Sequence, residues 1–277
     1  MKTRHQTQDP ARDRASSTVS RVALAAAALL AVAVAAFIGA NPTVAAGGSL
    51  DLGKPTSAMP QPPTGAFRRI GRTLQAHGRP ELLFIGTQGD DWSAAERWPV
   101  IKALAQFGTW SGLASSTGMS GPTANSNFGA VATFDWLHAQ FHSRYLTVVH
   151  KDVQDRGSHP LQRLSSLEAT LLRRYAPADD PRTSATWPLV VIGNYVMHGP
   201  GLPVGYFQDN QLHNYSFDTI QSGLQRGLSG YDPLSRLVTD INQETNVEIA
   251  LICHADGKKP SKVCQRGVIR HILKHVR

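Results

Sequence analysis

Residues Val22 to Ala40 form a 19-residue stretch that contains no charged residue and no proline. A helix of that length, rising 1.5 Å per residue, spans about 28 Å, close to the roughly 30 Å hydrocarbon core of a bilayer. Arg21 precedes the stretch, and residues 1–21 hold five basic and two acidic residues. Because positive charge favours the cytoplasmic flank, we expect a single-pass anchor in the cell membrane at 22–40, with 1–21 cytoplasmic and the C-terminal part extracytoplasmic.

A cleaved signal peptide is the alternative, because Thr43-Val44-Ala45 before Ala46 resembles a small-x-small cleavage site. The long charged head and the length of the apolar run, which exceeds the usual 7–15 residues of a signal peptide, favour the retained anchor. Both alternatives place the bulk of the chain outside the cytoplasm.

Residues 41–65 contain four glycines and five prolines, a composition typical of an extended linker without material for a core. We therefore expect a linker at 41–65 and one globular domain at 66–277. The net charge of +8 comes from the two ends of the chain, residues 1–21 and 253–277, while the middle is nearly neutral. Nucleic acid is not an expected partner, because the basic tail would lie on the wrong side of the membrane.

The first elements of the domain are a buried strand and a helix. Residues 81–85 are a short, mostly apolar run that ends in Gly86, which predicts a central strand. Residues 93–107 place apolar and charged side chains on opposite faces of a helix. Ser93 to Glu96 fits a capping box at its start, and Pro99 predicts a kink.

The later pattern predicts strands at 131–137 and 145–150 and a helix at 161–175. A hairpin then follows Trp187-Pro188 and turns at Gly193-Asn194. Helices are expected at 216–227, 233–254 and 262–275. This order predicts an α/β fold with a thioredoxin-like central sheet, flanking helices and extra C-terminal helices.

The stretch Arg79-Pro80-Glu81-Leu82-Leu83-Phe84-Ile85-Gly86, then seven positions, then Ala94-Ala95-Glu96-Arg97-Trp98 resembles the DUF929 family of thioredoxin-like proteins. The likeness continues through Phe107-Gly108-Thr109 and at Lys259-Pro260-Ser261 before Cys264, and covers most of 79–265. Members of the family typically carry a Cys-x-x-Cys pair between the strand and the helix.

In this chain the two cysteine positions of the family are Asp90 and Ser93, with Asp91 and Trp92 between them. A carboxylate at a helix N-terminus has a favourable charge but cannot form a mixed disulfide. Three interpretations stay open: helix caps, a general acid or base at Asp90 or Asp91, or a binding surface inherited from a redox site. By the same resemblance, Pro188 is the candidate for a cis-proline that faces this helix.

Cys253 and Cys264 are the two cysteines of the chain, eleven positions apart. In an oxidising compartment they predict a structural disulfide. Their use as a displaced redox centre is the alternative, although they lack the compact spacing of Cys-x-x-Cys.

No metal site and no cofactor are expected. The pairs His138/His142 and His271/His275 have i, i+4 spacing but no acidic or cysteine partner nearby, and zinc normally needs three or four ligands. Gly-x-Ser-x-Gly, a phosphate-binding loop and His-Glu-x-x-His do not occur.

These observations predict a membrane-anchored, extracytoplasmic, thioredoxin-like domain without a redox dithiol and without catalytic residues. Its expected role is binding or scaffolding, with a polypeptide or a cell-envelope component as ligand. The rival hypothesis is an envelope enzyme, either an oxidoreductase that uses Cys253/Cys264 or one with a non-cysteine site at Asp90/Asp91.

Overall fold

The structure is a computed structural model. It describes residues 50–54, 56–59, 67–118, 131–176, 187–199, 201, 212–257 and 261–275. The chain divides into the units Met1–Ala40 and Asn41–Arg277, and all described residues belong to the second. The predicted cytoplasmic segment, anchor and cleavage site lie outside the described residues. Within the described ranges, no helix is both long and apolar enough to cross a membrane.

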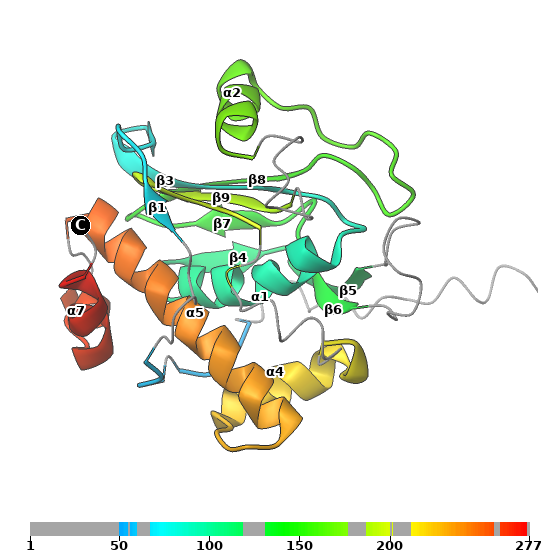
Figure 1. Ribbon diagram of the computed structural model, residues 1–277, viewed down its shortest axis with the longest axis vertical. Helices are drawn as coiled ribbons and strands as arrows, with labels where there is room; N and C mark the ends of the chain where they lie inside the picture. Colours follow the sequence, from blue (N-terminus) through cyan, green and yellow to red (C-terminus); the bar gives the residue numbers. More distant parts are fainter. Residues whose placement is uncertain are drawn as a thin grey trace, which may run out of the picture. The chain divides into compact units, whose positions relative to one another are not determined.

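One sheet forms the centre of the second unit (Figure 1). Its strand order is β1 (Arg68–Arg69), β10 (Tyr195–His198), β9 (Leu189–Ile192), β3 (Arg79–Gly86) and β2 (Gln75–Ala76), and β8 (Thr147–Asp152) also pairs with β3. β8 is parallel to β3, whereas β9 and β10 are antiparallel to their neighbours. The predicted central strand is confirmed, because Leu82 to Ile85 are all buried.

Two small strand pairs extend the fold beside this sheet. β4 (Thr109–Ser111) pairs with β7 (Gln140–His142), and β5 (Ala114–Gly118) pairs with β6 (Val131–Asp135). Of these strands only β6 was predicted. Strands of two or three residues, such as β1, β2, β4 and β7, are too short to show the alternation by which a strand is recognised.

The described helices are α1 (Asp91–Leu104), α2 (Ser166–Tyr175), the short 3-10 helix η1 (Leu212–Asn214), α4 (Phe217–Arg226), α5 (Pro233–Ala255), α6 (Ser261–Cys264) and α7 (Gly267–Leu273). α2 lies on one face of the sheet, and α1 and α5 lie on the other (Figure 1). Successive side chains of β3 point to opposite faces of the sheet, so this strand contributes to two hydrophobic cores. Leu82 and Phe84 face the large cluster with α1 and α5, while Leu83 and Ile85 face a smaller one that α2 covers.

Two predicted helices differ from the structure. α2 begins at Ser166, five residues later than expected, because Ser165 and Glu168 form a reciprocal capping box that defines its start. The predicted helix at 262–275 was wrong as one element, since it is divided into α6 and α7. The second of these begins at Gly267, a weak helix former, and Cys264 before the break is tied to α5 by a disulfide.

The described part of the predicted linker 41–65 packs onto the domain, which differs from the expectation that it lacks core material. Leu52 is buried in the large core. The Lys102 ammonium of α1 donates to the Leu52 carbonyl, and the Asn246 amide of α5 donates to the Ala58 carbonyl at 2.8 Å. Buried donors on two helices therefore hold this stretch in place.

Candidate functional site

Asp90 is the N-cap of α1 and lies in the connection between β3 and this helix. Its carboxylate oxygen Oδ2 accepts a hydrogen bond from the Ser93 backbone N–H at 2.6 Å. The predicted capping box at Ser93 is wrong, because Ser93 is already the third residue of the helix and its hydroxyl accepts from the Thr87 N–H at 3.3 Å. Gly86 makes this approach possible, since a Cβ there would lie 2.7 Å from the Ser93 hydroxyl. α1 then runs through Pro99 without interruption.

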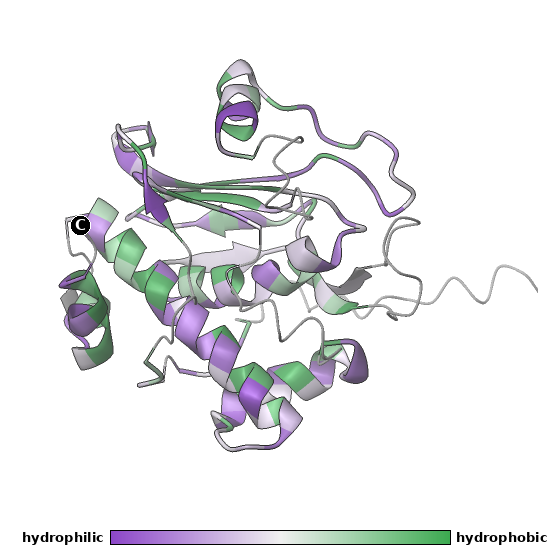
Figure 2. Cartoon of the chain, viewed as in Figure 1, coloured by the Kyte–Doolittle hydropathy of each residue, from purple (hydrophilic) through white to green (hydrophobic). Residues whose placement is uncertain are grey.

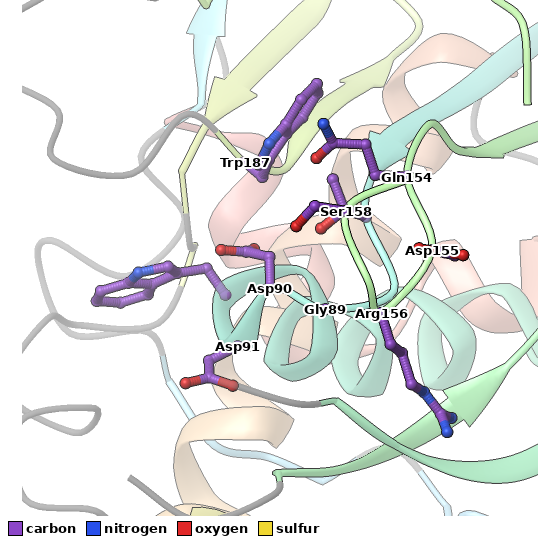
Figure 3. Close-up of a pocket in the computed structure, with 10 residues that line it drawn as sticks. Gly89, Asp90, Asp91, Gln154, Asp155, Arg156, Ser158 and Trp187 are labelled. Carbon is purple, nitrogen blue, oxygen red and sulfur yellow. The ribbon is translucent and has the colours of Figure 1, made fainter. Parts of the chain in front are cut away.

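A pocket of about 190 Å³ opens at the start of α1 (Figure 3). Three segments build it: the β3–α1 connection with the first residues of α1, the loop after β8, and Trp187 before β9. Its lining residues are Thr87, Gly89, Asp90, Asp91, Trp92, Gln154, Asp155, Arg156, Ser158 and Trp187. The Trp187–Pro188 bond, the candidate for a cis peptide bond, is cis. The pocket thus gathers Asp90, Asp91 and Trp92, whereas Ser93 is buried and does not line it.

Burial shifts the pKa of two of the three carboxyl groups in the pocket, those of Asp90 and Asp91. It raises the pKa of Asp90, and the hydrogen bonds from Ser93 oppose that rise. Burial also raises the pKa of Asp91 to about 6, with the neighbouring charge of Asp90 as a second cause. The oxygen Oδ1 of Asp91 is buried and has no hydrogen-bond partner among the described residues. Asp91 is therefore mostly ionised at pH 7 and mostly neutral at pH 5.

A buried ion pair connects the elements that carry the pocket residues. The Arg97 guanidinium of α1 contacts the Asp152 carboxylate at the end of β8 at 2.7 Å, and both side chains are 2% exposed. The same guanidinium nitrogen donates to the Thr87 carbonyl at 2.9 Å. Arg97 thus ties α1, β8 and the β3–α1 connection together. The sequence shows Arg97 in the family motif, but nothing in it identifies Asp152 as the partner.

The loop after β8 forms one wall of the pocket. The Asp155 carboxylate pairs with the exposed His159 ring at 3.1 Å, and the Arg156 side chain hydrogen-bonds the Ser116 hydroxyl of β5. Arg156 is turned away from Asp90 and Asp91 (Figure 3), so it does not neutralise them directly.

The predicted disulfide between Cys253 and Cys264 is present, with the two Cα atoms 5.6 Å apart. Both cysteines are buried, and neither lines the pocket. Cys253 lies in the last turns of α5, and Figure 1 shows that end of α5 apart from the start of α1. The structure therefore does not bring the sulfur atoms to Asp90–Ser93.

Neither histidine pair belongs to a group of three converging metal-ligating side chains within the described residues. His138 and His142 are exposed, and so are His271 and His275, whose rings lie 5.1 Å apart. Among the described residues, three other metal-ligating side chains converge: Glu96, Glu244 and Glu248. Sequence reasoning missed them because it concentrated on histidine and cysteine. The i, i+4 spacing of Glu244 and Glu248 was the available signal.

No curated protein and no solved structure matches this chain. A family model described as a domain of unknown function, DUF929, matches residues 67–220. The matched part includes β3, α1, the pocket and the β9–β10 hairpin, and confirms the resemblance seen in the sequence. Since the match covers more than half of the chain, the protein belongs to the DUF929 family.

Proposed function

We propose that this protein is anchored in the cell membrane by residues 22–40 and presents an extracytoplasmic, thioredoxin-like binding domain. The domain binds its ligand in the pocket at the start of α1 and carries out no thiol–disulfide exchange there. The support for the anchor is the uncharged segment and its basic N-terminal flank. The disulfide between Cys253 and Cys264 suits an oxidising compartment.

The connectivity of the sheet supports the thioredoxin-like assignment. α1 connects β3 to a parallel neighbour, β8, with two small strand pairs inserted on the way. The chain then passes through α2 into the antiparallel pair β9–β10, and later into α5 on the face that α1 also covers (Figure 1). A βαβ unit followed by an antiparallel hairpin and a helix is what we expect of this fold.

The observation that carries the proposal is the composition of the pocket. Asp90 and Asp91 supply carboxyl groups, Trp92 and Trp187 supply aromatic surface, and no cysteine lines the cavity. Carboxylates attract cationic groups, and tryptophan binds both cations and apolar stems. The chemistry that fits is a polypeptide segment that bears lysine or arginine, in keeping with a polypeptide or envelope ligand.

A direct test uses two labelled peptides of equal length, one alternating Lys and Ala and the other Glu and Ala. Fluorescence anisotropy is measured with the full chain in detergent micelles at pH 7. We expect the lysine peptide to bind and the glutamate peptide not to bind. Asp91→Asn should weaken binding about tenfold, which corresponds to the loss of one partly desolvated charge pair.

Asp218→Asn is the matched control, because Asp218 is an exposed carboxylate on α4 outside the pocket. Equal weakening by both variants would indicate general attraction to negative charge and would contradict the pocket. Wild-type binding should also weaken below pH 6, where Asp91 becomes neutral. The same weakening in Asp91→Asn would contradict its assignment.

A second candidate function is acid–base catalysis at Asp91, favoured by its pKa of about 6 and its unpartnered oxygen. Against it, no histidine lines the described pocket. Mass spectrometry of the lysine peptide after incubation separates the two functions. Binding predicts an intact peptide, whereas modification that disappears in Asp91→Asn would favour catalysis.

A further inference from the structure

Three carboxylates converge where α1 crosses α5. Glu96 lies in the second turn of α1, and Glu244 and Glu248 lie one turn apart on α5. One oxygen from each carboxylate falls within 4.8 Å of the other two. All three residues are 0% exposed. Glu96 thus lies beside two side chains that are 148 or more positions away in the chain.

Among the described residues, little compensates the charges of Glu96 and Glu248. Both oxygens of Glu248 are buried without a hydrogen-bond partner of normal geometry, although the Glu96 carboxyl is near enough to affect its pKa. Glu96 accepts one hydrogen bond, from the Gly201 N–H at 2.9 Å, and its other oxygen has none. Within the described residues, no ion pair joins Glu96 or Glu248 to a basic side chain.

Such an arrangement is costly unless protons or a cation neutralise it. A buried ionised carboxylate is retained in proteins when it is paired or coordinates a metal.

Polar and closely packed groups surround the three carboxylates. The middle of α5 carries a band of polar residues (Figure 2) that is nevertheless buried, between apolar residues toward both ends of the helix. The Thr245 hydroxyl donates to the Ile241 carbonyl at 2.7 Å within α5. The backbone of Gly201 closes over the cluster, since a Cβ there would lie 2.4 Å from an oxygen of Glu244.

We propose that Glu96, Glu244 and Glu248 form a binding site for one hard divalent cation of the Mg²⁺, Mn²⁺ or Ca²⁺ class. Carboxylate oxygens are the ligands that such cations prefer, whereas soft metals select sulfur. The bound cation bridges α1 and α5 and stabilises the face of the sheet that carries the large core. This site is separate from the pocket at Asp90 and Asp91 and does not depend on the function proposed for it.

The test uses Mn²⁺ as the probe and the full chain in detergent micelles, first stripped with a chelator. Electron paramagnetic resonance of free Mn²⁺ measures the bound fraction during a titration, and Mg²⁺ and Ca²⁺ are added as competitors. We expect one Mn²⁺ per chain. Glu244→Gln and Glu248→Gln should each weaken binding by more than about tenfold.

The matched control is Asp218→Asn, which removes an exposed carboxylate from α4 outside both sites. It should bind Mn²⁺ like the wild type. Mn²⁺ should raise the melting temperature of the wild type and leave that of Glu248→Gln unchanged.

Two results would overturn the proposal. Absence of Mn²⁺ binding to the stripped wild type would mean that protons alone neutralise the cluster, and this result is independent of whether any variant folds. Unchanged Mn²⁺ affinity in folded Glu248→Gln would place the bound ion elsewhere.

Discussion

Acidic groups lie at two places along helix α1. The two places have the same carboxyl chemistry but differ in burial and in hydrogen-bond partners. At the start of α1, Asp90 and Asp91 line an open pocket, and Asp90 accepts a backbone N–H of the helix. In its second turn, Glu96 is fully buried beside two further carboxylates. The first turn of a helix offers unpaired N–H groups and the positive end of the dipole, whereas in the second turn those donors are already used.

Adjacent positions in that second turn show the same contrast. Arg97 is buried like Glu96, but it pairs with Asp152 at the end of β8. Position along the helix and the partner that the fold brings from elsewhere decide whether a buried charge stabilises the structure. The variants below test this difference by the urea unfolding of the full chain in micelles. Tryptophan fluorescence reports on the domain alone, because all five tryptophans lie between positions 92 and 187.

The largest effect is expected for Asp152→Asn, which leaves the Arg97 guanidinium buried without its anion. The free energy of unfolding should fall by about 3–5 kcal/mol, typical for breaking a buried pair from one side. Asp218→Asn, at an exposed position, is the control and should change it by less than about 0.5 kcal/mol. A loss for Asp152→Asn no larger than that of the control would contradict the role of this pair.

Next in size is the double variant Cys253→Ser/Cys264→Ser. Opening a loop of eleven positions should cost about 3 kcal/mol in the chain-entropy account of disulfides. Because neither cysteine lines the pocket, binding of the lysine peptide by the folded fraction should be unchanged. A loss of peptide binding in folded protein would mean that the two regions are coupled.

Asp91→Asn should change how stability depends on pH. The folded pKa of Asp91 is about 6 against an ordinary value of 3.8. Between these values the folded wild type holds a proton that the unfolded chain has released, so its stability falls as pH rises. The variant lacks this loss and should be more stable at pH 7 by on the order of 1–2 kcal/mol after solvent screening, and equal near pH 3.5. Parallel stability curves from pH 3.5 to 7 would contradict the assignment.

The smallest effect is expected at Asp90, whose first role is to cap α1. Asp90→Ala should cost ~1 kcal/mol of unfolding free energy. Asp90→Asn keeps a capping oxygen and serves as the matched variant, with a much smaller loss. Equal losses in the two variants would mean that the charge of Asp90, and not its hydrogen bond to Ser93, stabilises the helix.

Local patterns predicted much of the fold. The apolar run of β3, the amphipathic pattern of α1, the turn between β9 and β10 and the long α5 are each visible in a few consecutive residues. The short strands β1 and β4 are not, because their pairing comes from distant partners. The packing of Leu52 also escaped prediction, since buried donors 50 or more positions away hold its segment.

The two candidate sites differ in the same way. Asp90 and Asp91 were found because they follow a recognisable strand and precede a recognisable helix. Asp152 and Glu96 act through partners that the tertiary fold supplies. The i, i+4 spacing of Glu244 and Glu248 indicated that both lie on one face of a helix. Nothing in the neighbouring sequence indicated that Glu96 lies beside them.

We propose that the pocket at the start of α1 binds its ligand without exchanging electrons. Reduction of the insulin disulfides by dithiothreitol, with catalytic amounts of the full chain, tests this most directly. We predict the same rate for the wild type, for Cys253→Ser/Cys264→Ser and for buffer alone, because no thiol lies at Asp90 to Ser93. Turnover by the wild type above that of the double variant would mean that the protein exchanges electrons through Cys253 and Cys264.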